Sequence, residues 1–336
     1  MKWLKRIAVL LLLIALFVVY VRHDGIQYTM AFVLRSWSKP YFNVETYRAK
    51  PNCDAATPCE SGKLKVMTYN VLCRVCEKEG YDKWYMRWPH LKDVIAKYDA
   101  DLLGLQELGG FGDIDTILKA FPQYACETYK FGPWAYGDCA LFYRADRFEV
   151  LDAGQMWLSP KPTVPFAHNW RPLTVPRYVN WAYLRQKSNG FRFLFVNTHF
   201  DNTGLNKENA AQMFSRTFRP IAESTPIIAT GDFNTGPRDE KRYKKILGLC
   251  DGPAVFKDAM ALVPAQNLVK DIPSGANEEE TQYHINLTWT IDHILIAGPV
   301  EIEVANWTQD SSGYEPQHRW PSDHPAVYSE INLRMR

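Results

Sequence analysis

Short apolar runs rich in β-branched and aromatic residues recur along the chain from residue 64 onward, and these runs predict β-strands. Residues 90–98 have helical spacing instead and lie between two of the runs. Strands and helices that alternate in this way are typical of a layered α/β domain. The predicted strands are residues 65–71, 101–105, 140–143, 181–184, 191–197, 226–229, 291–296 and 326–331.

A longer apolar run near the N-terminus, residues 7–21, directly follows the basic residues Lys2, Lys5 and Arg6. Its length is roughly 22 Å at about 1.5 Å per residue, which is short for a bilayer unless flanking residues extend it. The preceding positive charges predict that the N-terminus stays in the cytoplasm and that the rest of the chain is exported. A cleaved signal peptide is the alternative, but residues 17–21 lack the small residues that a signal peptidase requires, so we favour a retained anchor.

The chain divides into three predicted parts. Residues 1–22 form a signal anchor and residues 23–62 form an irregular juxtamembrane stalk. Residues 63–336 form one folded domain, because no repeat or long linker divides them. Within that domain, the proline-rich residues 159–176 are the longest irregular insertion and a candidate substrate loop. We therefore predict a single-pass membrane protein whose folded domain lies in the periplasm or outside the cell.

The composition permits a large core and does not select a partner. Of the 336 residues, 46% are hydrophobic, and Lys and Arg number 39 against 37 for Asp and Glu. A chain with balanced charge has no overall field that would drive nonspecific nucleic-acid binding. Nucleic acid stays open as a partner, but the charge does not demand it.

Seven cysteines fit an exported protein, although their odd number leaves at least one without a partner in the chain. Cys73 and Cys76 form a C-x-x-C pair, and a structural zinc site there would need a second matching pair, which the spacing of the other cysteines does not provide. Disulfides are therefore favoured over zinc, and the pairing itself stays open. Candidate pairs include Cys53 with Cys59 and Cys126 with Cys139.

Polar side chains suited to phosphate and metal chemistry follow the ends of the predicted strands. Each one alone is explained by an ordinary turn or a core contact. Several carboxylates in one cleft repel each other unless a cation neutralises them, and Mg²⁺ takes carboxylate oxygens while keeping positions for phosphate. Together with a histidine beside an aspartate to activate water, the set predicts metal-assisted hydrolysis of a phosphoester. Its members are Asn70, Glu107, His199, Asp232, Asn234, Asp292, Asp323 and His324.

Six segments that carry these residues, in this order, resemble the motif series of the endonuclease/exonuclease/phosphatase superfamily, which includes pancreatic-type deoxyribonuclease. A further similarity, at residues 157–159 and 176–177, is to a bacterial branch of that superfamily whose substrates it does not fix. The resemblance spans residues 64 to about 333. The six segments are residues 67–71 (MTYNV), 105–107 (LQE), 197–200 (NTHF), 230–234 (TGDFN), 291–294 (IDHI) and 322–324 (SDH).

The resemblance implies a deoxyribonuclease I-like fold: a four-layered α/β sandwich in which two mixed β-sheets pack face to face with helices outside. It also implies a magnesium site, for which Mn²⁺ is an alternative ion. Glu107 would hold the metal, with Asn70 and Asp323 close to the metal or to the phosphate.

The resemblance also assigns the catalytic roles. His324 would act as general base or stabilise phosphoryl charge, and Asp292 would orient it. Asp232 and Asn234 would position the attacking water and the developing oxyanion. His199 would bind the phosphate from the other side.

Two further residues are candidate substrate ligands. Arg177 precedes the strand at residues 181–184 and would approach a phosphate, although a surface ion pair explains it equally well. Tyr136 precedes the strand at residues 140–143, where some members of the family place a phosphate-contacting tyrosine.

We therefore expect a Mg²⁺-dependent phosphoester hydrolase that acts outside the cytoplasm. Its substrate is nucleic acid, a phospholipid head group or a phosphorylated metabolite, and no protein partner is evident. A catalytically inert exported binding protein is the alternative, and its mark would be the loss of Glu107, Asp232 or His324. A glycoside hydrolase with two carboxylates would not need the Asn and His residues at these positions.

Overall fold

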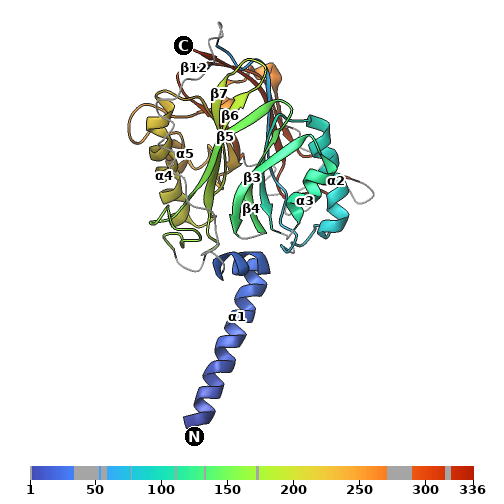
Figure 1. The fold of residues 1–336 in the computed structure, drawn as a ribbon, viewed down its shortest axis with the longest axis vertical. Helices are drawn as coiled ribbons and strands as arrows, with labels where there is room; N and C mark the ends of the chain where they lie inside the picture. The colour runs from blue at the N-terminus through green and yellow to red at the C-terminus, as the bar shows by residue number, and fades with distance from the viewer. Residues whose placement is uncertain are drawn as a thin grey trace.

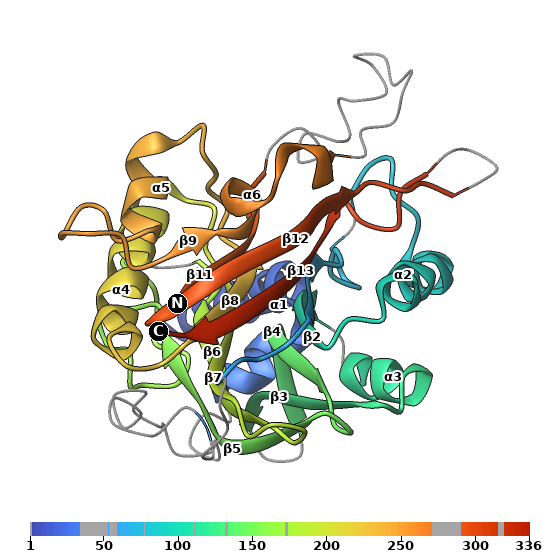
Figure 2. The same cartoon turned by 90° about the horizontal axis from the view of Figure 1, so that it is seen from above.

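The computed structural model describes residues 2–33, 53, 59–76, 78–109, 112–131, 134–171, 174–270, 290–314 and 319–336. Across these residues, two β-sheets lie face to face and helices cover their outer faces (Figure 1). Seen from above, α2 and α3 lie on one side of the paired sheets, and α4 and α5 lie on the other (Figure 2). The expected four-layered α/β sandwich is confirmed.

The first sheet has seven strands in the order β10-β12-β13-β1-β2-β4-β3. It is mixed, because β1 runs parallel to β2 and antiparallel to β13. The parallel pair brings the ends of β1 and β2 to the same edge, where the first two sequence motifs lie. The strands are β1 Leu64–Asn70, β2 Leu102–Leu108, β3 Tyr124–Phe131, β4 Trp134–Arg144, β10 Leu268–Lys270, β12 Val300–Asp310 and β13 Ala326–Met335.

The second sheet has six strands in the order β5-β6-β7-β8-β11-β9. β7 runs parallel to β8, and β11 runs antiparallel to β8 with Asp292 opposite Asp232. The start of β11 therefore meets the ends of β7 and β8. The strands are β5 Phe148–Trp157, β6 Tyr178–Gln186, β7 Arg192–His199, β8 Ile227–Asp232, β9 Lys257–Asp258 and β11 Asp292–Ala297.

Amphipathic helices close the two outer faces. Leu91, Val94 and Ile95 of α2 pack on the first sheet, and Phe214 and Phe218 of α4 pack on the second. Helix α2 begins before the predicted residues 90–98, because its first turns precede Pro89 and bury Trp84. The helices of these layers are α2 Trp84–Tyr98, α3 Asp113–Ala120, α4 Gly204–Ala222, α5 Glu240–Ile246 and α6 Ala259–Leu262, and a 3₁₀ turn covers Ala265–Asn267.

Alternate side chains along each strand face the space between the sheets. These side chains are apolar over most of the strand and polar at one end. Along β7, Phe193 and Phe195 face the core between the sheets, and His199 keeps the same phase. Along β8, Ile228 faces this core and Asp232 keeps the same phase. The candidate site residues therefore continue the inter-sheet core where its apolar side chains end.

A buried network of amide and hydroxyl groups joins the two sheets beside this polar end. Asn197 donates from Nδ2 to the carbonyl oxygens of Leu105 (3.0 Å) and Ala140 (2.9 Å) in the opposite sheet. Its Oδ1 accepts from Gln106 Nε2 at 2.7 Å and from Thr230 Oγ1 at 3.2 Å. These bonds satisfy buried polar groups and hold the sheets in one relative position.

The N-terminal helix α1, Lys2–Val33, projects away from the layered domain (Figure 1). It extends past residue 22, where the predicted anchor ends. Within the part of the chain that the structure describes, no helix meets the length and hydropathy needed to cross a membrane. Near the other end of the predicted stalk, Ser61 joins the layered domain by donating its backbone N–H to the carbonyl of Leu333 at 2.8 Å.

Two disulfides close short loops, Cys53–Cys59 and Cys73–Cys76. The first confirms one of the two candidate pairs, and the second uses the C-x-x-C thiols that a zinc ion would need.

The other candidate pair, Cys126 with Cys139, is wrong, because both thiols are free. Cys126 lies opposite Phe142 in the β3–β4 pair, so the register separates the two cysteines by three positions along β4.

Candidate active site

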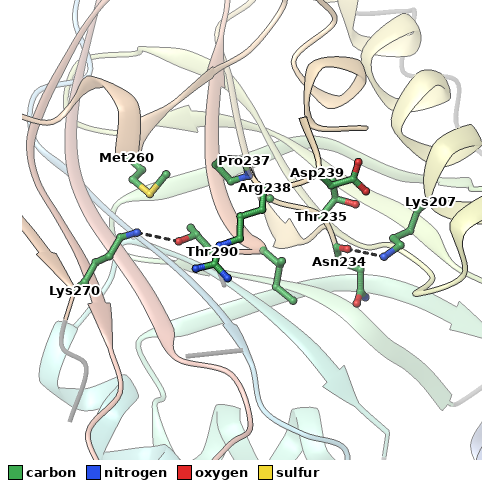
Figure 3. A pocket seen from close by; sticks show the side chains of 11 residues that line it. Lys207, Asn234, Thr235, Pro237, Arg238, Asp239, Met260, Lys270 and Thr290 are labelled. Carbon is green, nitrogen blue, oxygen red and sulfur yellow. Dashed lines mark hydrogen bonds between the residues drawn. The ribbon is translucent and has the colours of Figure 1, made fainter. Parts of the chain in front are cut away.

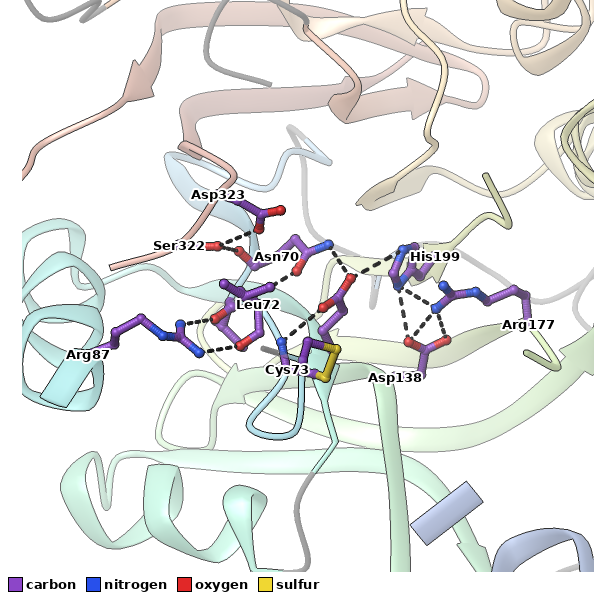
Figure 4. The surroundings of a disulfide bond; sticks show 12 residues. Asn70, Leu72, Cys73, Arg87, Asp138, Arg177, His199, Ser322 and Asp323 are labelled. Atoms are coloured by element: carbon purple, nitrogen blue, oxygen red, sulfur yellow. Dashed lines mark hydrogen bonds and ion pairs between the residues drawn. A yellow bond between two sulfur atoms is a disulfide. The ribbon is translucent and has the colours of Figure 1, made fainter. Parts of the chain in front are cut away.

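The residues predicted at strand ends come together at one end of the inter-sheet space, in a contact chain that both sheets supply. Figure 4 shows Asn70 at its centre, with Ser322 and Asp323 on one side and His199 on the other. Six of the eight predicted residues are linked by side-chain contacts to one another: Asn70, Glu107, His199, Asp232, Asp292 and His324.

The carboxylate of Asp232, at the end of β8, is the meeting point of these contacts. Its Oδ2 accepts from Asn70 Nδ2 at 3.0 Å and lies 3.3 Å from His199 Nε2 and 3.6 Å from His324 Nε2. Its Oδ1 accepts from the backbone N–H of Asn234 at 2.8 Å. Asp232 is only 1% exposed, so neighbouring donors and cations must balance its charge.

Glu107 in β2 reaches the site through an uncommon backbone conformation, with φ of 66°. Its Oε1 accepts from Asn70 Nδ2 at 3.1 Å and lies 3.9 Å from His199 Nε2, and its Oε2 accepts from the Cys73 N–H at 2.9 Å. Regular alternation would place Glu107 on the helix side of the sheet, where Leu105 packs. A left-handed non-glycine residue costs free energy, and here it turns a carboxylate into the site.

His324 and Asp292 form a buried pair. His324 Nδ1 lies 2.8 Å from Asp292 Oδ2, so Nε2 is the ring nitrogen that faces Asp232. Burial alone lowers the pKa of His324, but the charges of Asp292 and Asp232 outweigh it and raise this pKa well above its usual range. Burial raises the pKa of Asp292, and the nearby charge of Asp232 raises it further.

His199 is held from behind by a pair that the sequence motifs do not include. Asp138 in β4 accepts from Arg177 Nη1 through both oxygens, at 2.6 and 2.8 Å, and its Oδ1 lies 3.1 Å from His199 Nδ1. Burial raises the pKa of Asp138, but the charges of Arg177 and His199 outweigh it and set this pKa at about 2. Asp138 is therefore ionised at neutral pH and fixes His199 Nε2 toward Asp232.

This geometry changes the role expected for Arg177. Its Nη1 contacts both Asp138 and His199, so Arg177 positions a site residue in addition to any contact with substrate. Asp138 itself could have been found in the sequence, because a carboxylate inside an apolar strand must have a partner when it is buried.

A second missed residue, Arg87 in α2, fastens two site loops together. Its guanidinium donates to the carbonyl oxygens of Val71 (2.8 Å) and Leu72 (2.7 Å) after β1 and of Pro321 (2.6 Å) before β13. The side chain is fully buried, and Figure 4 shows its guanidinium pointing toward the backbone at Leu72. Arg87 therefore holds the loop after β1 against the loop that carries His324.

The two remaining predicted site residues lie at the edges of the contact chain. Asn234 has φ of 48°, and its Nδ2 donates to the carbonyl of Phe200 at 2.9 Å, which fixes the turn after β8. Asp323 Oδ2 accepts from Lys78 Nζ at 2.6 Å. Burial would raise the pKa of Asp323, but the charges of His324 and Lys78 hold it below its usual range.

Tyr136 lies away from solvent, in a buried aromatic cluster with Trp157, Phe166 and Tyr178. Its hydroxyl donates to the carbonyl oxygen of Pro176 at 3.1 Å. This placement gives Tyr136 a packing role next to the segment that carries Arg177, and it does not support the predicted contact with phosphate.

The donor set fits a hard divalent cation. The Glu107 carboxylate lies beside the Asn70 amide, whose Nδ2 donates to it at 3.1 Å, and ligand atoms of Asp232, Asp292 and His324 lie within 4.8 Å of one another. Each carboxylate oxygen of Glu107 accepts one hydrogen bond and keeps a lone pair for a metal. Oδ1 of Asp292 is buried without a hydrogen-bond donor from the described residues. Oxygen ligands with surplus negative charge are what Mg²⁺ and Mn²⁺ prefer.

The chain belongs to the endonuclease/exonuclease/phosphatase family, whose family model matches residues 67–324. This match confirms the resemblance seen in the motifs. The activities that give the family its name hydrolyse phosphoester bonds, so the expectation that the chain is a phosphoester hydrolase is also confirmed.

Individual relatives are distant. Nocturnin of Xenopus laevis is 24% identical over 300 residues, which cover 80% of this chain and 72% of the relative. A mannosyl-6-phosphatase of Bacteroides thetaiotaomicron has a similar structure, with a TM-score of 0.62 and 23% identity over 80% of this chain and 99% of that one. The human nocturnin catalytic domain with bound sulfate has a TM-score of 0.56 and 19% identity over 81% of this chain and 94% of that one. At this identity the solved structures establish the fold.

We predict that Asp138→Asn lowers kcat on a phosphoester by roughly 10- to 100-fold while the chain stays folded, because the orientation of His199 depends on the Asp138 carboxylate. The rate on bis(p-nitrophenyl) phosphate measures this effect. Asp146→Asn is the matched control, since Asp146 binds Arg144 on the exposed surface beyond the same strand. An unchanged kcat in the folded Asp138→Asn variant would contradict the assigned role.

Proposed function

We propose that this chain is a Mg²⁺-dependent phosphoester hydrolase that acts outside the cytoplasm. One observation supports the proposal above all: Asn70, His199 and His324 all contact the carboxylate of Asp232. Each of the two histidines is in turn held by an aspartate of its own. Such a set combines a base for water with donors for phosphoryl oxygens.

The position of each residue determines its role in the proposed reaction. Asp232 holds the attacking water and takes its proton, and the Asn234 N–H fixes the orientation of that carboxylate. His199 and His324 face Asp232 through Nε2 and donate to oxygens of the phosphoryl group, where negative charge develops. Asp292 orients His324 in the same way that Asp138 orients His199.

Glu107 would hold the metal, with Asn70 and Asp323 close to the metal or to the phosphate. A Mg²⁺ or Mn²⁺ ion held there would neutralise charge on the phosphoryl and leaving oxygens and would relieve the repulsion between Glu107 and Asp232, whose carboxylates share the Asn70 amide.

The inert binding protein is the second candidate, and the geometry favours the enzyme over it. A protein that kept only the fold would not need Glu107, Asp232 and His324 within contact of one another and of their orienting partners. A similar structure is that of a mannosyl-6-phosphatase, and a phosphorylated sugar is accordingly the first substrate class to screen, before other phosphorylated metabolites, nucleic acid and phospholipid head groups.

We predict that the purified chain hydrolyses bis(p-nitrophenyl) phosphate with Mg²⁺ and loses this activity in EDTA. His324→Ala should lower the rate by roughly 10²- to 10⁴-fold, because the substitution removes a donor to the phosphoryl group. His90→Ala, on helix α2 and outside both the contact chain and residues 159–176, is the control. The proposal fails if activity survives EDTA or if His324→Ala matches the unsubstituted chain.

Export and membrane attachment are also part of the proposal. They are supported by the charge and hydropathy pattern of residues 2–21 and by the two disulfides, which persist in oxidising compartments.

We predict that the full chain stays in the membrane fraction after an alkaline carbonate wash and that its domain is digested by protease added from the non-cytoplasmic side. A chain that begins at residue 25 should instead be released by the wash. Recovery of the full chain in the wash, or protection of the domain in spheroplasts, would refute the anchor or the orientation.

A further inference from the structure

A cavity of about 450 Å³ adjoins the candidate active site on the side of the second sheet. Its lining includes Asn234, two residues after Asp232, and Ile291, next to Asp292. The volume lies within the range of pockets that hold small organic ligands. A ligand in this cavity would therefore lie beside the carboxylate that receives the contacts of the site.

Three cationic side chains from three separate segments line the cavity. Lys207 extends from α4, Arg238 from the turn after β8, and Lys270 from the end of β10 (Figure 3). No carboxylate among the described residues lies within ion-pair distance of any of the three. Asp239 also lines the cavity, but its carboxylate pairs with Arg242. The wall therefore carries a surplus of positive charge.

Hydrogen bonds hold two of these three cationic side chains in place. Lys207 Nζ donates to the carbonyl oxygen of Asn234 at 3.0 Å, and Lys270 Nζ donates to Thr290 Oγ1 at 3.3 Å. Burial lowers the pKa of Lys207, and the charge of Arg242 lowers it further, so an anion beside Lys207 would stabilise its charged form. Between these two lysines, Arg238 has no hydrogen bond or ion pair to a described residue and points into the same space (Figure 3).

A second cavity, of about 590 Å³, lies on the other side of the site and also contains basic residues. Three of its four cations already have partners within the protein, and the fourth, Lys83, shares the cavity with the carboxylates of Glu79 and Asp82. Arg74 pairs with Asp113, Lys78 pairs with Asp323, and Arg87 donates to backbone carbonyl oxygens. Among the residues that the structure describes, the cavity beside Asn234 is therefore the one whose lining carries several cations without a carboxylate partner.

We propose that the cavity lined by Lys207, Arg238 and Lys270 binds a second anionic group of the substrate, so that the enzyme prefers phosphoesters that carry another phosphate. Guanidinium and ammonium groups recognise phosphate through charge-assisted hydrogen bonds. Met260 and Pro237 provide an apolar surface for the organic frame between the two phosphates. The ligand class is a bisphosphorylated sugar or nucleotide. This inference rests on the proposed function only for the position of the bond that is cleaved.

The test compares bisphosphates with monophosphates of the same frame. Phosphate release by the full chain is measured with adenosine 3′,5′-bisphosphate against adenosine 5′-monophosphate, and with glucose 1,6-bisphosphate against glucose 6-phosphate. We expect kcat/KM to be about tenfold higher for the bisphosphate of at least one pair, and the pair that shows it identifies the frame. Arg238→Ala with Lys270→Ala should abolish this ratio, mainly through KM of the bisphosphate.

The double variant Lys244→Ala with Lys257→Ala is the matched control, because it removes the same charge from exposed positions outside the cavity. The proposal is overturned if neither pair shows a preference or if the preference survives in the Arg238 and Lys270 variant. It is also overturned if the control abolishes the preference as effectively.

Binding without turnover separates this inference from the proposed function. The same bisphosphates are titrated calorimetrically into the full-length His324→Ala variant in EDTA. If the enzyme assay on bis(p-nitrophenyl) phosphate fails but the bisphosphate binds and the Arg238 and Lys270 substitutions weaken that binding about tenfold, the proposed function is wrong and the anion site stands. If the bisphosphate binds no better than the monophosphate, the anion site is refuted.

Discussion

Repulsion between buried carboxylates is the constraint on which the rest of the structure depends. Glu107, Asp232 and Asp292 face one space, and Asp232 and Asp292 are almost fully buried. Charges in such a place are stable only when donors or cations surround them. Asn70 and the two histidines balance part of the negative charge. The negative charge that they leave unbalanced is the physical reason for a divalent cation.

The fold meets this constraint by arranging the side chains between the sheets in successive layers. Apolar side chains fill most of the space between the sheets, the amides of Gln106 and Asn197 follow, and the ionisable groups come last. The two-residue period of the strands sets the first two layers and places His199 and Asp232 in the third, whereas Glu107 enters the third layer only through its left-handed backbone. Outside them, Arg87 and Asp138 hold the loops and the rings in place, so that the charged groups cannot relax away from one another.

The sequence predicted most of the residues that meet at the candidate site, because polar residues at strand ends interrupt apolar runs and their order matches a known family. It did not predict Arg87, because an arginine in an amphipathic helix looks like a solvated residue until the helix start before Pro89 is known. The Cys126–Cys139 pair was wrong because strand register is a tertiary property. Tyr136 was placed near phosphate by family likeness alone, and its burial follows from aromatic packing that local sequence does not encode.

The cation site follows from the carboxylate constraint, and its direct test is metal binding. Mn²⁺ titrated into the purified chain and followed by its electron paramagnetic resonance signal counts the bound ions, and Mg²⁺ added afterwards should displace them. The account predicts that Glu107→Gln weakens binding by roughly 10- to 100-fold, while Glu149→Gln, at a half-exposed ion pair with Arg185, leaves it unchanged. Absence of bound Mn²⁺, or binding that Glu107→Gln does not alter, would contradict the claim that these buried carboxylates form a metal centre.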